Sequence, residues 1–278
     1  MSTLAEHPVL IVGAGPVGLT LALGLLRQGV AVLVFERRRR PAHDPRATTL
    51  QPPVLDALDR LGVLAQVEAH GRRVGSLEYW DWGAKRERLA SVPLAALAGE
   101  VDHPWRLHCA QPDLNEVLAA AIESEFPGAI QYDSPVESFR DHGDCVEVTV
   151  RSGSRTRVLR GSWLAACDGA RSDTRSALEV TSTQVDGSDT FFTCEVDGLH
   201  ESLRGEAVGD ASYLLTKLGF GLLMRMPEST RLLFRLERPE SGRPDIASTH
   251  PLLGILFGSD SVPRLRNKAI YTIRQRVA

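Results

Sequence analysis

Apolar residues near the N-terminus form two short runs, and a helical pattern of apolar residues lies between them. Residues 9–12 form an apolar run that is typical of a fully buried parallel strand. Residues 19–26 predict a helix that is apolar nearly all round and ends before Gly29, a residue type suited to the position after a helix. Residues 30–35 form a second apolar strand, which Glu36 ends. This order predicts a βαβ unit.

Two further helices are predicted where apolar residues recur with a period of 3.6 residues. The first has Pro53 in its opening turn and ends at Gly62. The second covers residues 112–125, and its core-facing stripe consists of Leu114, Val117, Leu118 and Ile122. Because both helices are amphipathic, each is expected to cover another element.

Strand patterns dominate the rest of the chain. Residues 76–90 predict a hairpin in which alternation places Trp80 and Trp82 on one face. Two aromatic rings on one strand face are either core or a ligand platform, and the core is favoured. Further strands are predicted at 129–133, 145–151, 155–167 and within 190–237, and the third of these closes with a buried run at 163–167.

The order of these elements predicts an α/β protein with two interleaved domains. We expect residues 1–75 and 101–178 to form a nucleotide-binding α/β domain. Residues 76–100 are expected to be a β insertion, and residues 179–278 to be a β-rich domain. A chain of 278 residues is long enough to bury a sizeable core.

Composition narrows the classes of function. The net charge of −3 gives no reason to expect nucleic acid or a membrane surface as a partner. The four cysteines are scattered without metal-ligand spacing, which predicts reduced thiols in a cytoplasmic protein. The start of the chain lacks the basic region of a signal peptide, and no stretch reaches transmembrane length. No metal-binding or hydrolytic constellation is visible, so we assign neither a catalytic side chain nor a metal ligand.

The turn of the first βαβ unit has the GxGxxG pattern. Its six residues are Gly13, Ala14, Gly15, Pro16, Val17 and Gly18. The first glycine permits a tight turn, the second lets the backbone approach a pyrophosphate, and the third lets the helix pack on the strand. The helix N-terminus offers free N–H groups to phosphate, and Glu36 is placed to accept hydrogen bonds from a ribose diol. A glycine-rich turn of an unrelated α/β domain is the disfavoured alternative.

Two other segments carry candidate phosphate ligands. Residues 37–40 are four consecutive arginines, for which we favour a solvated loop at the mouth of the site over a phosphate- or adenine-binding arginine. The apolar run at 163–167 ends in Asp168-Gly169, a pair that is usually only a turn. Ligands, however, collect at the carboxyl ends of strands in open α/β sheets, and Arg171 and Arg175 can meet phosphates there.

Three separated motifs together resemble a known family. They are GAGPVG with Glu36 after it, Pro45-Arg46-Ala47 followed by a helix that ends in Leu-Gly, and CDGARSDTR at 167–175. In this order and spacing they are similar to the FAD-dependent aromatic hydroxylases of the para-hydroxybenzoate hydroxylase type, in particular the bacterial branch that acts on phenols and aromatic polyketides. The resemblance implies a Rossmann-like FAD-binding domain of the GR2 type, interleaved with a β-rich substrate-binding domain.

The resemblance also implies a cofactor and the residues that hold it. The residues that match FAD-binding positions are Gly13, Ala14, Gly15, Pro16, Val17, Gly18, Glu36, Arg37, Arg46, Gln111, Asp168, Gly169 and Arg171. Among them, Glu36 would hold the adenosine ribose and Arg37 would lie beside the adenine. Arg46 and Gln111 would contact the ribityl and pyrophosphate region. The segment from Asp168 to Arg171 would serve both FAD and NAD(P)H.

The chemistry that the resemblance implies is monooxygenation of a small aromatic substrate. NAD(P)H would reduce the flavin, and O₂ would add to give a flavin hydroperoxide that attacks the ring. Such a step requires a dry pocket. The second β-rich insertion resembles the sheet that covers the flavin's substrate side. Its aromatic residues and methionine are expected to be core lining first and substrate contacts second: Phe191, Phe192, Tyr213, Phe220 and Met224.

One family motif is not matched. The family has a later Gly-Asp motif followed by His and a Pro- and Gly-rich helix start, whereas Gly209-Asp210 leads into a strand pattern, so we favour a structural role for Asp210. Residues 269–278 resemble the strand and helix that precede the true motif. We therefore expect a C-terminally incomplete chain whose flavin site is completed by a second polypeptide, or a homo-oligomer.

Two alternatives remain open. The chain is either one half of a split monooxygenase or a shortened, non-catalytic nucleotide-binding subunit of such an enzyme. A plain NAD-linked oxidoreductase is disfavoured, since neither the Asp168-Gly169 segment nor the β-rich insertions belong to a simple doubly wound dehydrogenase.

Overall fold

The computed structural model describes most of the chain. The described residues are 7–40, 48–83, 86–197, 208–217, 219–236, 250–257 and 264–277. The chain divides into two compact units, between which it passes several times. The first unit comprises Met1–Thr48, Ala57–His70 and Cys109–Val180, and the second comprises Thr49–Asp56, Gly71–His108 and Thr181–Ala278.

The first unit is built on a parallel four-stranded sheet in the order β12-β1-β2-β8. Its strands are β1 (Val9–Val12), β2 (Val32–Phe35), β8 (Ile130–Gln131) and β12 (Trp163–Ala166). β1 lies between β2 and β12, with Val9 opposite both Val32 and Trp163. The two apolar runs that predicted buried parallel strands thus form the middle of the sheet.

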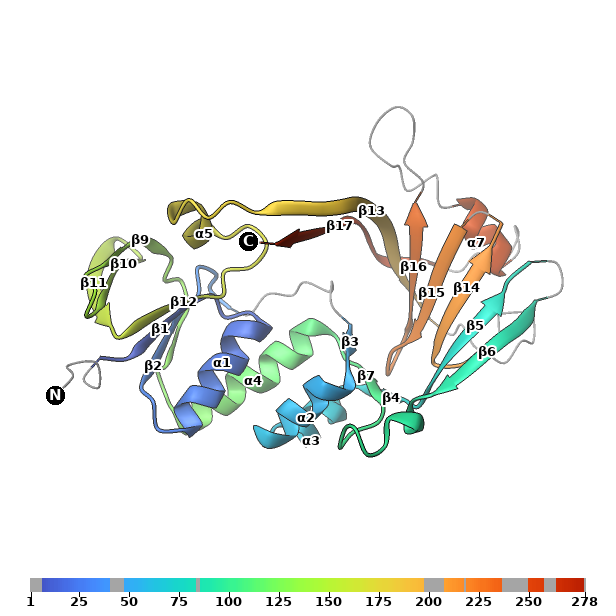
Figure 1. The fold of residues 1–278 in the computed structure, drawn as a ribbon, viewed down its shortest axis with the longest axis horizontal. Helices are drawn as coiled ribbons and strands as arrows, with labels where there is room; N and C mark the ends of the chain where they lie inside the picture. Colours follow the sequence, from blue (N-terminus) through green and yellow to red (C-terminus); the bar gives the residue numbers. More distant parts are fainter. Residues whose placement is uncertain are drawn as a thin grey trace, which may run out of the picture. The chain divides into compact units, whose positions relative to one another are not determined.

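Helices cover one face of this sheet. The helices that contact its strands are α1 (Pro16–Arg27) and α4 (Gln111–Glu125). The structure also contains the helices α2 (Pro52–Arg60), α3 (Leu64–Ala69) and α5 (Asp173–Ala177). α1 and α4 pack side by side (Figure 1). α1 begins with Pro16 in its first turn, where proline needs no hydrogen bond, and ends before Gly29, whose φ is +78°. The predictions for α1, α2 and α4 are confirmed.

A three-stranded antiparallel sheet covers the other face. It consists of β9 (Val136–Asp141), β10 (Val146–Ser152) and β11 (Arg155–Gly161), in the order β11-β10-β9. Leu10 and Phe35 pack here against Val148 and Val150, and all four side chains are buried. The sequence patterns predicted β10 and β11 but missed β9.

The run at 163–167 was predicted to be a buried strand, and this prediction is wrong. β12 is a terminal strand of its sheet, and the Trp163 side chain is 65% exposed. Its apolar composition therefore does not reflect burial within the first unit. An edge strand needs only one partner strand, so the second side of β12 is unpaired among the residues that the structure describes.

The second unit is built on a seven-stranded sheet in the order β17-β13-β16-β15-β14-β5-β6. Its strands are β5 (Ser76–Asp81), β6 (Glu87–Pro93), β13 (Thr183–Val196), β14 (Ala211–Thr216), β15 (Gly219–Arg225), β16 (Thr230–Leu236) and β17 (Arg266–Val277). β5 and β6 form the predicted hairpin, followed by a 3₁₀ turn at Leu94–Leu97. A smaller sheet, in the order β3-β7-β4, consists of β3 (Thr49–Leu50), β4 (Arg72–Val74) and β7 (Arg106–His108).

One face of the large sheet carries the core of this unit. Trp80, Trp82, Phe192 and Phe234 are buried there together with Leu253, Leu256 and Phe257 of α7 (His250–Phe257). The core interpretation of Trp80 and Trp82 is confirmed. Phe192 belongs to this core, which agrees with the expectation that it is a core residue first, and strand alternation puts it on the face opposite Phe191.

The end of the chain also differs from expectation. Residues 269–278 were expected to form a strand and a helix, but the described part belongs to the single strand β17, which pairs with β13. All four cysteines carry free thiols, and burial raises the pKa of Cys109 and Cys194 to about 12. Within the described residues, no helix combines the length and apolar character needed to cross a membrane.

Candidate nucleotide-binding site

The first unit contains a cavity of about 690 Å³ at the carboxyl ends of its parallel strands. Most of the predicted FAD-binding residues line it. These are Gly13, Gly15, Pro16, Val17, Glu36, Arg37, Gln111, Asp168, Gly169 and Arg171. Residues far apart in the sequence are therefore brought to one place, as the rule for ligand sites in open α/β sheets requires. Arg46 lies outside the described residues.

The three glycines of the turn differ in what a side chain would meet. At Gly13, where φ is +102°, a Cβ would lie 2.5 Å from the Cys167 carbonyl oxygen. At Gly18 a Cβ would lie 2.0 Å from the Gly13 carbonyl oxygen, so this position must be glycine for α1 to approach the turn. At Gly15 a Cβ would meet nothing within 4 Å. Gly15 thus leaves open space in the cavity, at the N-terminus of the 12-residue helix α1.

This arrangement fits a dinucleotide pyrophosphate. The open position at Gly15 gives a ligand direct access to the backbone, while the first N–H groups of α1 lack partners within the helix. Gly13 and Gly18 serve the packing of the turn, and Gly15 serves the ligand. The residues present therefore match what a bound FAD pyrophosphate requires.

Glu36 is held firmly at the wall of the cavity. Glu36 is 8% exposed. Its two carboxylate oxygens accept hydrogen bonds from the backbone N–H groups of Ala14 and Arg38, each at 2.9 Å. A carboxylate accepts about four hydrogen bonds, so both oxygens can still accept from a ribose diol. Ala14 does not itself line the cavity, because its N–H is directed at Glu36.

The arginine run is largely solvated. The Arg37 side chain lines the cavity, is 58% exposed and lies 3.6 Å from the Asp173 carboxylate. Arg39 forms a similarly exposed pair with Asp133 at 3.7 Å. Exposed pairs of this kind contribute little to stability. The geometry supports the interpretation of a solvated loop at the mouth of the site.

The Asp168 carboxylate is directed at the turn that follows it. Its Oδ2 accepts a hydrogen bond from the Thr174 N–H at 3.0 Å. Burial raises its pKa, but hydrogen bonds from Ser172 and Thr174 outweigh that effect and lower the pKa below the ordinary value, so the group stays ionised. Asp168 therefore fixes the loop that carries Gly169 and Arg171 along the cavity.

Arg175 is hydrogen-bonded within its own loop. Its guanidinium donates to the Ala170 carbonyl oxygen at 3.0 Å, within the same loop, and the residue does not line the cavity. Arg171 does line it and is exposed. Of the two arginines predicted to meet phosphates, only Arg171 is placed to do so.

Sequence reasoning missed one wall of the cavity. Residues 135–139, at the start of β9, line the cavity together with the glycine turn. The signal was weak, because the segment VESFRD of β9 mixes apolar and charged residues over only six positions. Cys167 and Ala177 also line the cavity, with small side chains.

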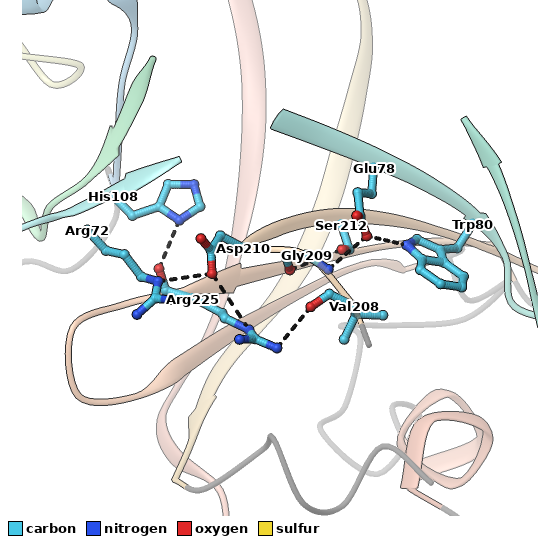
Figure 2. A network of polar contacts seen from close by, with 9 residues as sticks. All are labelled: Arg72, Glu78, Trp80, His108, Val208, Gly209, Asp210, Ser212 and Arg225. Carbon is cyan, nitrogen blue, oxygen red and sulfur yellow. Dashed lines mark hydrogen bonds and ion pairs between the residues drawn. The ribbon is translucent and has the colours of Figure 1, made fainter. Parts of the chain in front are cut away.

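Asp210 belongs to the second unit and takes part in a different structure. Its carboxylate accepts a hydrogen bond from the Arg72 Nε at 3.0 Å and lies 3.9 Å from the Arg225 Nε (Figure 2). The preceding Gly209 donates its N–H to Glu78 at 2.7 Å. Gly209-Asp210 leads into β14, as the strand pattern predicted, and Asp210 has the structural role expected of it.

Comparison with known proteins agrees with this geometry. The family model described as FAD binding domain matches residues 6–240. The chain is 33% identical over 180 residues to 6-hydroxy-3-succinoylpyridine 3-monooxygenase HspB of Pseudomonas putida (strain DSM 28022 / S16), a match of 61% of this chain and 43% of that protein. It is 30% identical to 6-methylpretetramide 4-monooxygenase of Streptomyces rimosus over 81% of this chain and 39% of that protein.

A solved structure gives the same picture. The crystal structure of p-nitrophenol 4-monooxygenase PnpA from Pseudomonas putida DLL-E4 superposes with a TM-score of 0.85 and 25% identity, covering 99% of this chain and 69% of that one. The chain spans less than half the length of the two curated relatives above. Because the family model matches residues 6–240, the chain belongs to the FAD binding domain family.

Proposed function

We propose that this chain provides the nucleotide-binding and substrate-binding parts of an FAD-dependent aromatic monooxygenase that uses NAD(P)H and O₂ in the cytoplasm. The observation that carries the proposal is the glycine turn: it borders the cavity that Glu36 also lines, and of its three glycines only Gly15 has room for a Cβ. When bound, FAD supplies the redox chemistry, and the protein supplies binding and orientation.

The residues of the cavity divide the work of holding FAD. The turn at Gly15 and the N-terminus of α1 would bind the pyrophosphate, and Glu36 would bind the adenosine ribose. Arg37 would lie beside the adenine. Gln111 and the loop from Asp168 to Arg171 would contact the pyrophosphate and the ribityl chain. Each of these side chains or backbone groups already lines the same space.

A small aromatic compound is the proposed substrate. The names of the similar proteins refer to 6-hydroxy-3-succinoylpyridine, 6-methylpretetramide and p-nitrophenol. The second unit offers Phe191, Tyr213 and Phe220 on one face of its large sheet, opposite the core. Apolar walls of this kind exclude water from a reacting flavin.

We further propose that additional polypeptide, from a second chain or another copy of this one, completes the flavin site. The supporting observation is β12, a terminal strand of the parallel sheet with Trp163 65% exposed, which runs into the Asp168 loop of the cavity. A further strand beside β12 would cover Trp163 and extend the cavity wall.

Titration of FAD into the purified chain tests the proposed cofactor. Gly15→Ala should weaken FAD binding about tenfold or more, since its methyl group would occupy the approach to the pyrophosphate. Gly24→Ala is the matched control, because its Cβ would make only an ordinary contact with Leu61 at 3.6 Å. Equal FAD affinity of the Gly15→Ala and Gly24→Ala variants would overturn the assignment of the turn.

Activity tests the rest of the proposal. We expect substrate-stimulated NAD(P)H oxidation and a flavin spectrum when the chain is combined with the product of a neighbouring reading frame that carries the family's later Gly-Asp motif. A yellow and fully active solitary chain would exclude the completing polypeptide. A colourless chain under both conditions would favour the non-catalytic subunit.

A further inference from the structure

Helix α4 buries a polar side chain in the middle of its apolar face. The buried residues of α4 are Leu114, Asn115, Leu118, Ala119 and Ile122, and Asn115 is 0% exposed. Neither its Nδ2 nor its Oδ1 has a hydrogen-bond partner among the described residues. Nearly all buried polar groups in proteins are hydrogen-bonded, and asparagine is also a poor residue for a helix interior. The Asn115 carboxamide is therefore costly to bury, and its position in the fold requires an explanation.

Gln111 is the neighbour of Asn115 on the side of the cavity. It is the first residue of α4 and lines the cavity, whereas Asn115 follows four residues later and does not line it. Side chains at this spacing share one face of a helix, with Cβ atoms about 5–6 Å apart, and glutamine and asparagine placed in this way can hydrogen-bond to each other. Among the described residues that line the cavity, Gln111 is the only carboxamide. It is therefore the cavity residue best placed to bond Asn115.

The starts of two helices favour an anion in this part of the cavity. Gly15 precedes α1 and Gln111 begins α4, and both residues line the cavity. The residues at the two N-caps, Gly15 and Ala110, have no polar side chain that could accept from the first turn. The positive ends of both helix dipoles thus favour a group such as a pyrophosphate. A side chain that meets this group must present a donor to it.

A carboxamide meets an anion correctly in only one of its two orientations. The NH₂ group of Gln111 donates and attracts a phosphate oxygen, whereas its carbonyl oxygen only accepts and repels one. The two ends of the amide are nearly equal in shape, so packing alone does not distinguish them. A donor from Asn115 to the Gln111 oxygen would distinguish them, because it leaves the NH₂ group for the anion.

We propose that Asn115 is a positioning residue of the nucleotide site: when a pyrophosphate ligand fills the cavity, the Asn115 Nδ2 donates to the Gln111 Oε1 and so directs the Gln111 NH₂ group at the anion. The class of ligand, a dinucleotide, rests on the proposed function. Gln111 is half-buried, so a ligand in the cavity would exclude water from it and strengthen its bond to Asn115. Part of the binding free energy then comes from a residue that does not touch the ligand.

FAD titration and thermal unfolding of the full chain test this role together. Asn115→Leu keeps the volume and removes both polar atoms. FAD affinity should fall about fivefold or more, because Gln111 loses its orienting donor. The midpoint of unfolding without FAD should rise by about 2–4 °C, because a buried amide without a partner is removed. A purely structural role would move affinity and stability in the same direction and would overturn the proposal.

Two further variants complete this comparison. Asn115→Ala removes the same polar atoms with less volume and gives the affinity should the leucine not fit. Ile122→Leu is the matched control, because Ile122 is buried on the same face of α4 and lies seven residues beyond Asn115. Its FAD affinity should stay within about twofold of the wild type. An equal loss of affinity in Ile122→Leu would assign the effect to the packing of α4 and not to the amide.

A double-mutant cycle shows whether Asn115 acts through Gln111. Gln111→Ala should itself weaken FAD binding, and Asn115→Leu should cause no further loss in that background, since no amide remains to be oriented. Losses that add would overturn the proposal, and so would a Gln111→Ala variant that binds FAD like the wild type.

ADP separates this inference from the identity of the cofactor, because it carries two linked phosphates without a flavin. If the chain binds ADP but not FAD, and Asn115→Leu weakens ADP binding, the inference is retained and the proposed function is lost. If FAD binds equally well to the wild type and Asn115→Leu, the proposed cofactor stands and the inference is overturned. Binding of neither ligand to the wild type would overturn both.

Discussion

Two pairs of a glycine and an acid in the molecule, Gly15 with Glu36 and Gly209 with Asp210, differ in structure. In the first unit, Gly15 faces open space and Glu36 is held by two backbone N–H groups. In the second unit, a Cβ on Gly209 would lie 2.7 Å from the Glu78 carboxyl carbon, and Asp210 is bonded by the guanidinium of Arg72. One pair borders a cavity, and the other is packed against its neighbours.

The difference shows what makes a glycine part of a ligand site. Both glycines allow another group to approach the backbone closely. At Gly209 that group is the Glu78 side chain, whereas the space beside Gly15 is open to a ligand. Both acids accept hydrogen bonds, but Asp210 accepts from the Arg72 guanidinium, whereas Glu36 accepts from uncharged backbone N–H groups. A ligand site is therefore recognised by a backbone position with open space beside it and by an acid without a charged partner among the described residues.

The largest expected effect is that of Gly18→Ala. This substitution would disturb the packing of α1 against the turn that carries Gly15. Its methyl group would lie 2.0 Å from the Gly13 carbonyl oxygen, which is backbone and cannot move alone. We expect a loss of about 3 kcal/mol in the free energy of unfolding of the first unit. Gly209→Ala should cost less, about 1 kcal/mol, because the obstacle is the end of a side chain. Urea denaturation followed by segment-resolved hydrogen exchange measures both, and equal losses would contradict the distinction.

Next in size is the effect of Glu36→Gln on FAD binding. The amide would present an N–H group to one of the two backbone donors that now bond the carboxylate, so the side chain would turn from its place. We expect FAD affinity to fall about tenfold. Glu137→Gln serves as the control, since Glu137 also lines the cavity but pairs with Arg151 at its exposed edge. The idea fails if the two variants bind FAD equally well.

A smaller effect is expected from Asp210→Asn. The Asp210 side chain is 28% exposed and its partner Arg72 is 40% exposed, so the pair is partly screened by water. The second unit should lose about 0.5 to 1 kcal/mol of stability. FAD affinity should stay at the wild-type value, measured by the same titration. A marked loss of FAD binding would show that Asp210 has a cofactor role after all.

The smallest effect concerns pH. The folded-state pKa of His108 is lowered from its ordinary 6.5, so the unfolded chain binds a proton more readily than the folded one. Stability should therefore be intact above pH 6.5 and decline as the pH falls from there toward the lowered pKa. His108→Asn keeps a donor for the Arg225 carbonyl oxygen and should flatten this part of the curve, as followed by thermal unfolding between pH 5 and about 7. An unchanged slope in the variant would assign the decline to other groups.

Local patterns predicted those features whose cause is local. The turn at residues 13–18, the helix α4 and the hairpin of β5 and β6 follow from glycine positions, helical spacing and strand alternation. The joining of Gln111 and Asp168 in one cavity followed only from the family resemblance.

Features that depend on distant partners were not predicted. The exposure of Trp163 depends on whether a further strand flanks β12, which its own residues do not encode. The strand β17 was expected in part to be a helix because residues 269–278 resemble a family segment, and its pairing with the distant strand β13 was not predicted. The turn of Arg175 toward Ala170 reflects a choice of rotamer, which residue type and spacing do not determine.

The pairing of β13 with β17 also sets an order of events during synthesis. Thr183 lies opposite Val277, so the outer partner of β13 leaves the ribosome only after β14, β15 and β16 have been made. Until then β13, a strand of 14 residues, can pair only with β16. Such a long unpaired edge on a nascent chain invites pairing with other chains. Translation that stalls before Arg266 would therefore yield an aggregation-prone product rather than a smaller folded protein.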